Sequence, residues 1–317
     1  TGLSITAGYH RLFAHRSYQA HWSVRFIFLM FGAASFQNSL LKWATDHRIH
    51  HQKVDSESDP YSIKKGFFYA HIGWIFYRDH FKLENAPKDL RNDPMIMFQH
   101  NYYIPLAIFF GLIIPLIIGY QMGSALGGFF IAGWLRIVAV HHSTFFINSL
   151  CHTLGNQPYE INNSARDSWL MALLTFGEGY HNFHHKFQFD YRNGIKWYHF
   201  DPTKWLVKLL SYVKLTSQLK SIPAREILAS KRKLLEQVFS QSEAQESLKR
   251  KFEEFKNNLI EAEENYLCLM KQKNQKMQEI QLKIKLAQKR YQLSFRLYKH
   301  LVQEALTLRS TGSIPSR

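Results

Sequence analysis

Two long apolar stretches lie in the middle of the sequence. Residues 103–120 and 123–147 approach the length of about 20 residues with which a helix crosses a bilayer. Glycines and polar residues between them predict a tight turn, so we expect two crossings that return the chain to one membrane face. Arg136 and the pair His141–His142 interrupt the second stretch, and a charge there is expected to face other helices or the membrane surface. The alternative is two long buried helices of a soluble protein.

A shorter apolar stretch, residues 24–41, forms the second pattern. It contains Arg25, Gln37 and Asn38, and histidine clusters flank it on both sides. If these histidines bind one metal centre, the stretch must begin and end on the same membrane face. It is therefore predicted to lie in the membrane interface or to dip into it.

The third pattern is a periodic stripe in the last part of the chain. Residues 224–309 contain no proline or glycine, and apolar side chains recur there at alternating steps of three and four. Only Lys273 and Ser294 interrupt the stripe, and two steps of four around Lys273 predict a stutter. Residues 228–308 are therefore predicted to form a coiled coil, either folded back on itself or paired with another subunit. A solvated single helix is the alternative, and residues 310–317 are expected to be disordered.

Composition changes where the pattern changes. We therefore expect an aromatic, histidine-rich domain at residues 1–222 and a charged extension at residues 223–309. The formal net charge is +16, yet no zinc-finger spacing, RNA-recognition motif or basic helix-turn-helix accompanies it. Nucleic-acid binding is therefore not expected, and basic loops beside an anionic membrane explain the charge better.

Two further features concern the chain ends and the cysteines. The chain begins at Thr1 without methionine or a charged signal-peptide region, so we expect that an N-terminal part is missing. Cys151 and Cys268 are too few for a disulfide framework, and both are predicted to be free thiols in a reducing compartment.

Histidines gather in three clusters and at one single position. The clusters are YHRLFAH at residues 9–15, DHRIHH at 46–51 and YHNFHH at 180–185, and His152 follows Asn148 by four residues. On an α-helix the histidines of an HxxHH block share one face. Adjacent histidines differ by about 100° of rotation, so each doublet can serve two metal ions at once.

The spacing of the first cluster is different. His10 and His15 lie about 140° apart on an ideal helix, so they are expected to serve two ions unless the helix ends or bulges there. Imidazole suits iron, zinc, copper and nickel, so ligand type does not name the metal. A closed zinc site needs four ligands, whereas nine histidines are available, which indicates a dinuclear centre. The predicted ligands are His10, His15, His47, His50, His51, His152, His181, His184 and His185; the predicted non-ligands are His21, His71, His80, His100, His141, His142, His199 and His300.

These clusters and their flanking residues resemble the membrane acyl-CoA Δ9 desaturases, the stearoyl-CoA desaturase group, and look most similar to its bacterial members. The matching segments are TAGYHRLFAHRSY (6–18), FQNSLLKWATDHRIHHQKVDSESDPYS (36–62), GFFYAHIGW (66–74), FQHNYY (98–103), INSLCHTLGNQPY (147–159) and FGEGYHNFHH (176–185). The resemblance covers about residues 1–210. It implies two iron ions held by the nine histidines, with Asn148 touching one iron through water, and four membrane helices, of which the first two would be almost wholly absent. The extension has no counterpart in it.

The resemblance also suggests substrate contacts. By analogy Trp43, Thr144 and Phe145 are expected to line an apolar tunnel for the acyl chain, although aromatic residues near membrane helices can instead be interfacial anchors. Thr45 stands where animal members have an arginine, and Arg78-Asp79 stands where they have Arg-Lys. Both positions lie near the CoA phosphates in the resemblance. Acyl lipid and acyl-carrier protein therefore stay open beside acyl-CoA, with Arg78 as a candidate contact.

We therefore expect an all-α, multi-pass membrane protein with a cytosolic histidine-rich di-metal domain, in a bacterial inner membrane rather than the endoplasmic reticulum. Its expected activity is formation of a cis double bond, at Δ9, with O₂ and two electrons. The sequence has no dinucleotide fingerprint or haem-attachment motif, so a separate donor is expected, such as cytochrome b5 or ferredoxin with its reductase. The alternatives are a fatty-acyl or alkane hydroxylase with the same histidines, and an inactive fragment that acts through coiled-coil oligomerisation.

Overall fold

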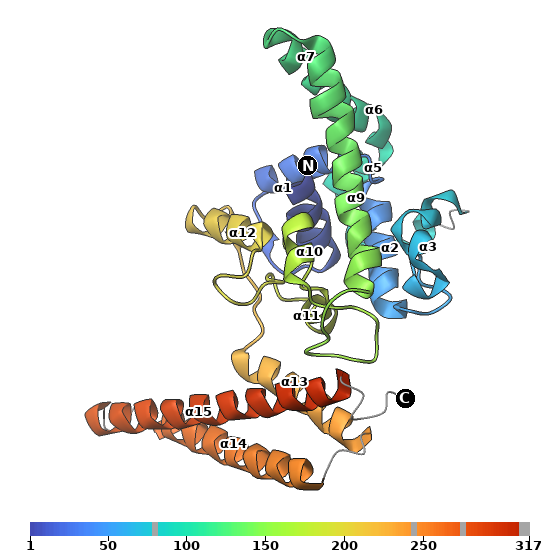
Figure 1. The fold of residues 1–317 in the computed structure, drawn as a ribbon. Coiled ribbons are helices and arrows are strands. Elements are labelled where there is room, and N and C mark those ends of the chain that lie inside the picture. The colour runs from blue at the N-terminus through green and yellow to red at the C-terminus, as the bar shows by residue number, and fades with distance from the viewer. Residues whose placement is uncertain (78–81, 242–245, 273–276, 311–317) are drawn as a thin grey trace. The chain divides into compact units, whose positions relative to one another are not determined.

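Helices make up nearly all the regular structure in the computed structural model, which describes residues 1–77, 82–241, 246–272 and 277–310 (Figure 1). The chain divides into two compact units between Lys231 and Arg232. Outside its two longest helices the first unit contains η1 (Ser4–Ala14), β1 (Gln19–Ala20), α1 (Trp22–Ala33), α2 (Leu40–Lys53), η2 (Ile63–Lys65), α3 (Phe67–His71), η3 (Gly73–Phe76), η4 (Leu83–Asn85), α4 (Lys88–Arg91), α5 (Pro94–Asn101), α10 (Trp169–Leu174), α11 (His181–Lys186), α12 (Pro202–Tyr212) and β2 (Thr216–Ser217). The two short strands pair antiparallel.

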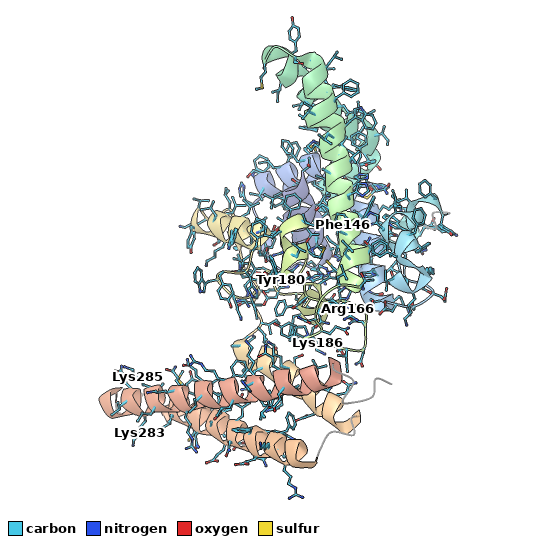
Figure 2. All side chains as sticks on the ribbon, in the orientation of Figure 1. Phe146, Arg166, Tyr180, Lys186, Lys283 and Lys285 are labelled. Atoms are coloured by element: carbon cyan, nitrogen blue, oxygen red, sulfur yellow. The ribbon has the colours of Figure 1, made fainter. Side chains whose placement is uncertain are left out.

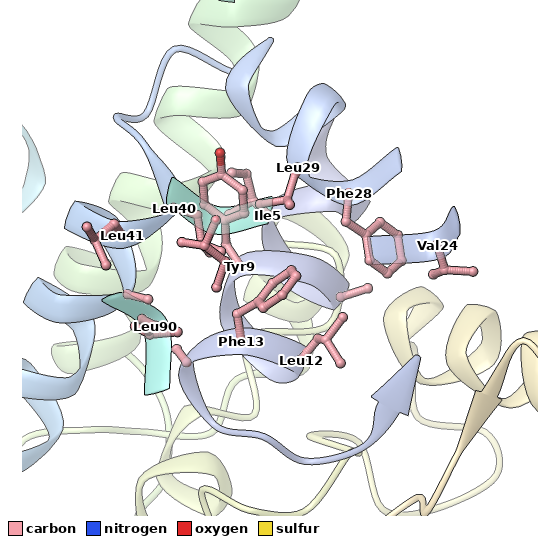
Figure 3. Packing of buried hydrophobic residues seen from close by; sticks show 14 of the residues in the cluster. Ile5, Tyr9, Leu12, Phe13, Val24, Phe28, Leu29, Leu40, Leu41 and Leu90 are labelled. Carbon is pink, nitrogen blue, oxygen red and sulfur yellow. The ribbon is translucent and has the colours of Figure 1, made fainter. Parts of the chain in front are cut away.

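The first unit is built around η1, a π-helix in which every residue is buried. Helices α1 and α2 pack against it, and their apolar side chains interlock with those of η1 in the core (Figure 3). Glycine permits this close approach: a Cβ at Gly8 would lie 2.6 Å from the Cβ of Phe28, and one at Gly32 would lie 2.2 Å from the Tyr9 ring. The core thus holds η1, which carries the first histidine cluster, in a fixed position beside α2.

Two helices are long and apolar enough to cross a membrane. The first, residues 103–121, joins α6 (Tyr103–Ile108), η5 (Phe109–Ile113) and α7 (Ile114–Gln121); the second, residues 125–152, joins α8 (Ala125–Gly127), η6 (Gly128–Leu135), α9 (Arg136–Ser149) and η7 (Leu150–His152). Their mean hydropathies are 2.2 and 1.3, and only 22% of each apolar window is buried. Such exposure is unlike that of core helices in a soluble protein, and it favours lipid as their surroundings.

Arg136 faces the other helices, as predicted for a charge within an apolar stretch. Its guanidinium donates to the carbonyl oxygens of Ala34 at 3.0 Å and Gly111 at 2.9 Å, and to Oγ1 of Thr1 at 3.1 Å. These bonds give the charged group partners within the protein.

The stretch at residues 24–41 is divided in the structure. Helix α1 ends at Ala33, and the chain bends through positive-φ residues Phe36 and Asn38 before Ser39 caps α2. Two of the polar residues have partners: Arg25 pairs with Asp93, and Nε2 of Gln37 donates to Oγ1 of Thr144 at 2.9 Å. Oε1 of Gln37 is buried without a hydrogen-bond partner among the described residues. At 12 residues α1 is too short to cross a bilayer, and its interfacial location stays a prediction.

Glycines bring the two long helices together beside their turn. A Cβ at Gly119 would lie 2.5 Å from the Cα of Gly128, and a Cβ at Gly128 would lie 2.3 Å from the carbonyl oxygen of Pro115. Gly123 has a φ of 92° in the turn itself. The backbones therefore touch at this end, where no side chain fits between them.

Gly128→Ala is expected to destabilise the first unit by about 1–3 kcal/mol, because overpacking against an immovable backbone forces the helices apart. Gly133→Ala in the same helix is the matched control, since its Cβ would meet the flexible end of Leu112 at 3.3 Å and backbone atoms only at the ordinary contact distance of 3.7 Å or more. Thermal unfolding in detergent measures both. Equal melting temperatures for the two variants would contradict this role for the contact.

The second unit contains most of α13 (Ala224–Gln241) with α14 (Glu246–Gln272) and α15 (Met277–Ser310). The first turns of α13 belong to the first unit, in which Oγ of Ser230 donates to the carbonyl oxygen of Tyr159 at 3.1 Å. The predicted domain boundary at residue 222 stays a prediction.

Helices α14 and α15 pack along each other through residues of the predicted stripe. Phe252, Leu259, Ile284 and Tyr298 are buried between helices of this unit, and the rings of Phe252 and Tyr298 lie 5.7 Å apart. This is the folded-back arrangement, while coiled-coil geometry and self-association stay predictions. The stutter at Lys273 and the predicted disordered tail after Ser310 lie outside the described residues.

Candidate metal centre

Nine histidines form two compact groups in the first unit. The first group is His10, His15, His47, His51 and His184; the second is His50, His152, His181 and His185. Within each group the ligand atoms lie within 4.8 Å of one another. All nine predicted ligands are therefore brought together, although they come from four distant segments of the chain.

Helical spacing explains how α2 and α11 contribute to both groups. His47 and His51, four residues apart on α2, enter the first group, whereas His50 enters the second. On α11, His181 and His185, four residues apart, enter the second group, whereas His184 enters the first. Each doublet is thus divided between the groups, which follows from the rotation of about 100° between adjacent helical residues.

His10 and His15 both belong to the first group, which matches the exception that their spacing left open for a helix that ends or bulges there. The reason is the π-helix η1, whose hydrogen bonds join residues five apart. The N–H of His15 donates to the carbonyl oxygen of His10 at 3.0 Å where η1 ends. The two imidazoles lie edge-on to each other, with ring centroids 4.8 Å apart.

Ring nitrogens face one another within the groups. The separations between Nε2 atoms are 2.9 Å for His10–His184, 2.8 Å for His15–His47, 3.0 Å for His51–His184, 3.1 Å for His152–His181 and 3.0 Å for His181–His185. A neutral imidazole has one donor and one acceptor nitrogen, so hydrogen bonds alone satisfy such clusters poorly. Buried Nε2 of His50 has no hydrogen-bond partner among the described residues. Cations between these nitrogens would accept all their lone pairs, so the donor set fits two metal ions.

Burial lowers the pKa of these imidazoles well below its ordinary value, and the charge that neighbouring histidines would carry lowers it further. This holds for His15, His47, His51, His181, His184 and His185. The side chains are therefore neutral at physiological pH. Neutral imidazole is the form that binds metal.

Polar partners that bond to Nδ1 fix the orientation of three of the predicted ligands. Nδ1 of His10 donates to Oε2 of Glu178 at 2.9 Å, and Nδ1 of His50 donates to Oδ1 of Asp59 at 2.9 Å. Nδ1 of His152 lies 2.7 Å from Oγ of Ser164. Such bonds hold Nε2 toward the centre of each group and increase its basicity.

Asp59→Asn is expected to weaken metal binding about 10–100-fold, because the neutral amide no longer holds the Nδ1–H of His50 as an anion does. Metal titration of the purified protein gives this affinity directly. Glu57→Gln is the matched control, since it removes an exposed carboxylate from the same segment. An Asp59→Asn affinity equal to that of the control would exclude this role.

A pocket of about 670 Å³ adjoins the histidines, within the size range of small-molecule sites. Trp43, Thr144, Phe145 and Asn148 line it, together with His10, His47, His50 and His181. The Trp43 ring stacks on His47 with centroids 4.9 Å apart. Three predicted tunnel residues thus share one pocket with members of both groups. Arg78, the fourth candidate contact, lies outside the described residues.

Other histidines lie outside both groups. Nε2 of His71 is 3.1 Å from Nδ1 of His142, and His141 bonds the carbonyl oxygen of Ser35 at 2.8 Å. His80 falls outside the described residues. Glu178, Asp59 and Ser164 were not predicted from the sequence as partners of the ligands, although two of them stand inside or beside a histidine-box segment. An acidic residue next to a box is the signal that would have found them.

A known protein family matches the part of the chain that contains both histidine groups. The model of the fatty acid desaturase family matches residues 1–214, more than half of the 317 residues. The chain belongs to the fatty acid desaturase family. The match ends near α12, so the second unit lies beyond the matched region.

Several members of this family resemble the chain. A "probable acyl-CoA desaturase" of Schizosaccharomyces pombe is 45% identical over 235 residues, which cover 72% of this chain and 48% of that protein. Acyl-CoA desaturase 1 of Saccharomyces cerevisiae is 45% identical over 229 residues, covering 71% and 45%. An sn-1 stearoyl-lipid 9-desaturase of Anabaena variabilis is 36% identical over 224 residues, covering 69% and 79%. The chain thus spans about half the length of the two fungal relatives, and the expected similarity to bacterial members stays a prediction.

Proposed function

We propose that this chain is a di-iron acyl desaturase that introduces a cis double bond, at Δ9, into a saturated acyl chain. The observation that carries the proposal is the pair of histidine groups beside a pocket that Trp43, Thr144 and Phe145 line. The nine histidines would hold two iron ions, with Asn148 reaching one of them through water. Bound iron supplies O₂-dependent oxidation able to remove hydrogen from an unactivated methylene group.

The role of the protein is to position the acyl chain. Trp43 is fixed by stacking on His47, and Phe145 packs edge-on to Trp74 with ring centroids 6.2 Å apart. These rings would hold one C–C bond beside the ligands and exclude water. Oγ1 of Thr144 accepts from Gln37 at 2.9 Å, so its methyl group is left for the substrate.

An acyl-CoA is the proposed substrate. The two fungal relatives and a stearoyl-CoA desaturase of Bos taurus are named for acyl-CoA, whereas the Anabaena enzyme is named for a stearoyl lipid. Thr45 removes one expected cation, but Lys65 and Lys82 also line the pocket. Lysines at a pocket suit the phosphates of a CoA thioester better than a neutral lipid.

We further propose that both long helices cross the membrane and that the histidine groups face the cytoplasm. Two crossings return the chain to one side, where both groups form. The two electrons would come from a separate donor such as cytochrome b5 or ferredoxin with its reductase. A bacterial plasma membrane stays the predicted location, with the endoplasmic reticulum as the alternative.

Expression in a host that lacks its own Δ9 desaturase tests the activity, with double-bond positions determined by mass spectrometry. Elemental analysis of the purified protein should show about two iron ions per chain, because the ligand number exceeds a mononuclear site. Hydroxylated acyl chains or alkanes would favour the hydroxylase instead. One zinc and no iron would overturn the metal assignment, and iron without either product would leave an inactive protein.

A further inference from the structure

Helix α15 has two apolar faces, and α14 covers only one of them. The covered face contains Ile284 and Tyr298, which are buried. The other face contains Leu282, Leu286, Leu293 and Leu297, which are 61%, 59%, 59% and 43% exposed. Single exposed leucines are ordinary, but four on one helix form an apolar patch that needs an explanation.

The spacing places these leucines in one line. Steps of four, seven and four residues keep all four within about 60° around the helix axis. Ile284 and Tyr298 lie about 160–200° away from Leu282 on the same scale. The exposed leucines therefore point away from the packed interior of the second unit.

Cations border the leucine face on both sides. The exposed basic residues on this part of α15 are Lys283, Lys285, Lys289, Arg290, Arg296 and Lys299, of which the first two are labelled in Figure 2. The sequence has no aspartate or glutamate from residue 280 to residue 303. The helix is thus apolar along one line and positively charged along its flanks.

We propose that this leucine face of α15 binds the surface of a membrane that contains anionic lipid. A helix with leucines in a line and lysine or arginine beside them is suited to the boundary between acyl chains and head groups. Anionic head groups attract the flanking cations. A second copy of α15 would instead bring two rows of like charge together, which opposes self-association through this face.

The rest of the chain makes such binding effective even if it is weak. The first unit carries two helices apolar and long enough to cross a bilayer, so membrane insertion of that unit would keep α15 close to lipid. Attachment within one chain raises the effective concentration of the surface that α15 meets. The proposal requires membrane insertion but does not require desaturase activity.

A fluorescent label on α15 tests the contact in the full chain reconstituted into vesicles. The label is attached at Leu286→Cys. Cys268 is exposed and is first replaced by serine, whereas Cys151 is buried and is kept. Gln288→Cys is the matched control, since it is exposed and lies about 160° from Leu286 around the axis, two residues away. Vesicles contain phosphatidylcholine alone or with phosphatidylserine, and a quencher attached to lipid acyl chains reports depth.

The label at residue 286 is expected to shift to shorter wavelength and to be quenched several-fold more than the label at 288, in vesicles with phosphatidylserine. Added salt should reduce the effect, because screening weakens attraction between surface charges. Changing Lys285, Lys289 and Arg296 together to glutamate should remove it while circular dichroism shows the helices intact. Self-quenching between labels at 286, independent of lipid, would assign the face to a second copy. A label equally exposed in both kinds of vesicle would also overturn the proposal.

Discussion

His184→Ala is expected to abolish product formation and to lower iron content. Nε2 of His184 lies 2.9 Å from Nε2 of His10 and 3.0 Å from Nε2 of His51, so it joins η1 and α2 within the first group. Loss of a group that only orients a ligand already costs about 10–100-fold, so loss of the ligand itself should cost more than about 100-fold. Mass spectrometry of acyl chains and elemental analysis of the purified protein measure the two effects.

The control is His300→Ala, which removes an exposed imidazole from the second unit, outside both groups. It should keep wild-type activity and iron content. Both variants should be produced in similar amounts, because a neutral imidazole at a metal-binding site contributes more to the metal than to packing. Full activity in His184→Ala would remove this residue from the ligand set.

The helical part of the candidate site was predictable from the sequence because it depends on local periodicity. The HxxHH spacing alone places three imidazoles on one side of α2 and of α11, whatever the rest of the fold does. The division of His50 from His51 between groups follows from the same geometry. The lengths of the two long apolar helices are likewise a local property of composition.

Features that depend on the tertiary structure were not predictable. The spacing of His10 and His15 left a bulge open as an exception, but no residue pattern in η1 distinguishes a π-helix from an α-helix. Glu178 and His10 are 168 positions apart, so nothing local joins them. The second apolar face of α15 was not predicted, because apolar residues spaced three and four apart describe only one side of a helix.

Arg11→Met is expected to destabilise the first unit by about 3–5 kcal/mol, because it leaves buried carboxylates without their cation. Arg11 is 1% exposed, and its guanidinium lies 2.8 Å from Glu178 and 3.0 Å from Asp201. It also donates to the carbonyl oxygen of Tyr191 at 2.8 Å. Denaturant unfolding of the protein in detergent measures the free-energy difference.

The same variant should also unfold at higher pH when acid is added. Burial alone would raise the pKa of Glu178, but the Arg11 guanidinium and His10 lower it to about 2. A carboxylate with a lowered pKa contributes stability above its unfolded-state value, about 4.5, and this is lost as the pH falls toward 2. Without Arg11 the pKa of Glu178 rises, so that contribution is lost nearer neutral pH.

Arg16→Met separates the effect of this buried charge from the loss of any arginine nearby. The Arg16 side chain is 64% exposed, and its contact with Asp89 is 3.8 Å long. Such a surface pair contributes less than about 1 kcal/mol, so Arg16→Met should leave both the unfolding free energy and the acid midpoint almost unchanged. Equal behaviour of the two variants would show that Glu178 and Asp201 do not depend on Arg11. Because Glu178 also orients His10, a true dependence should appear as weaker metal binding in Arg11→Met at neutral pH, under conditions in which the protein remains folded.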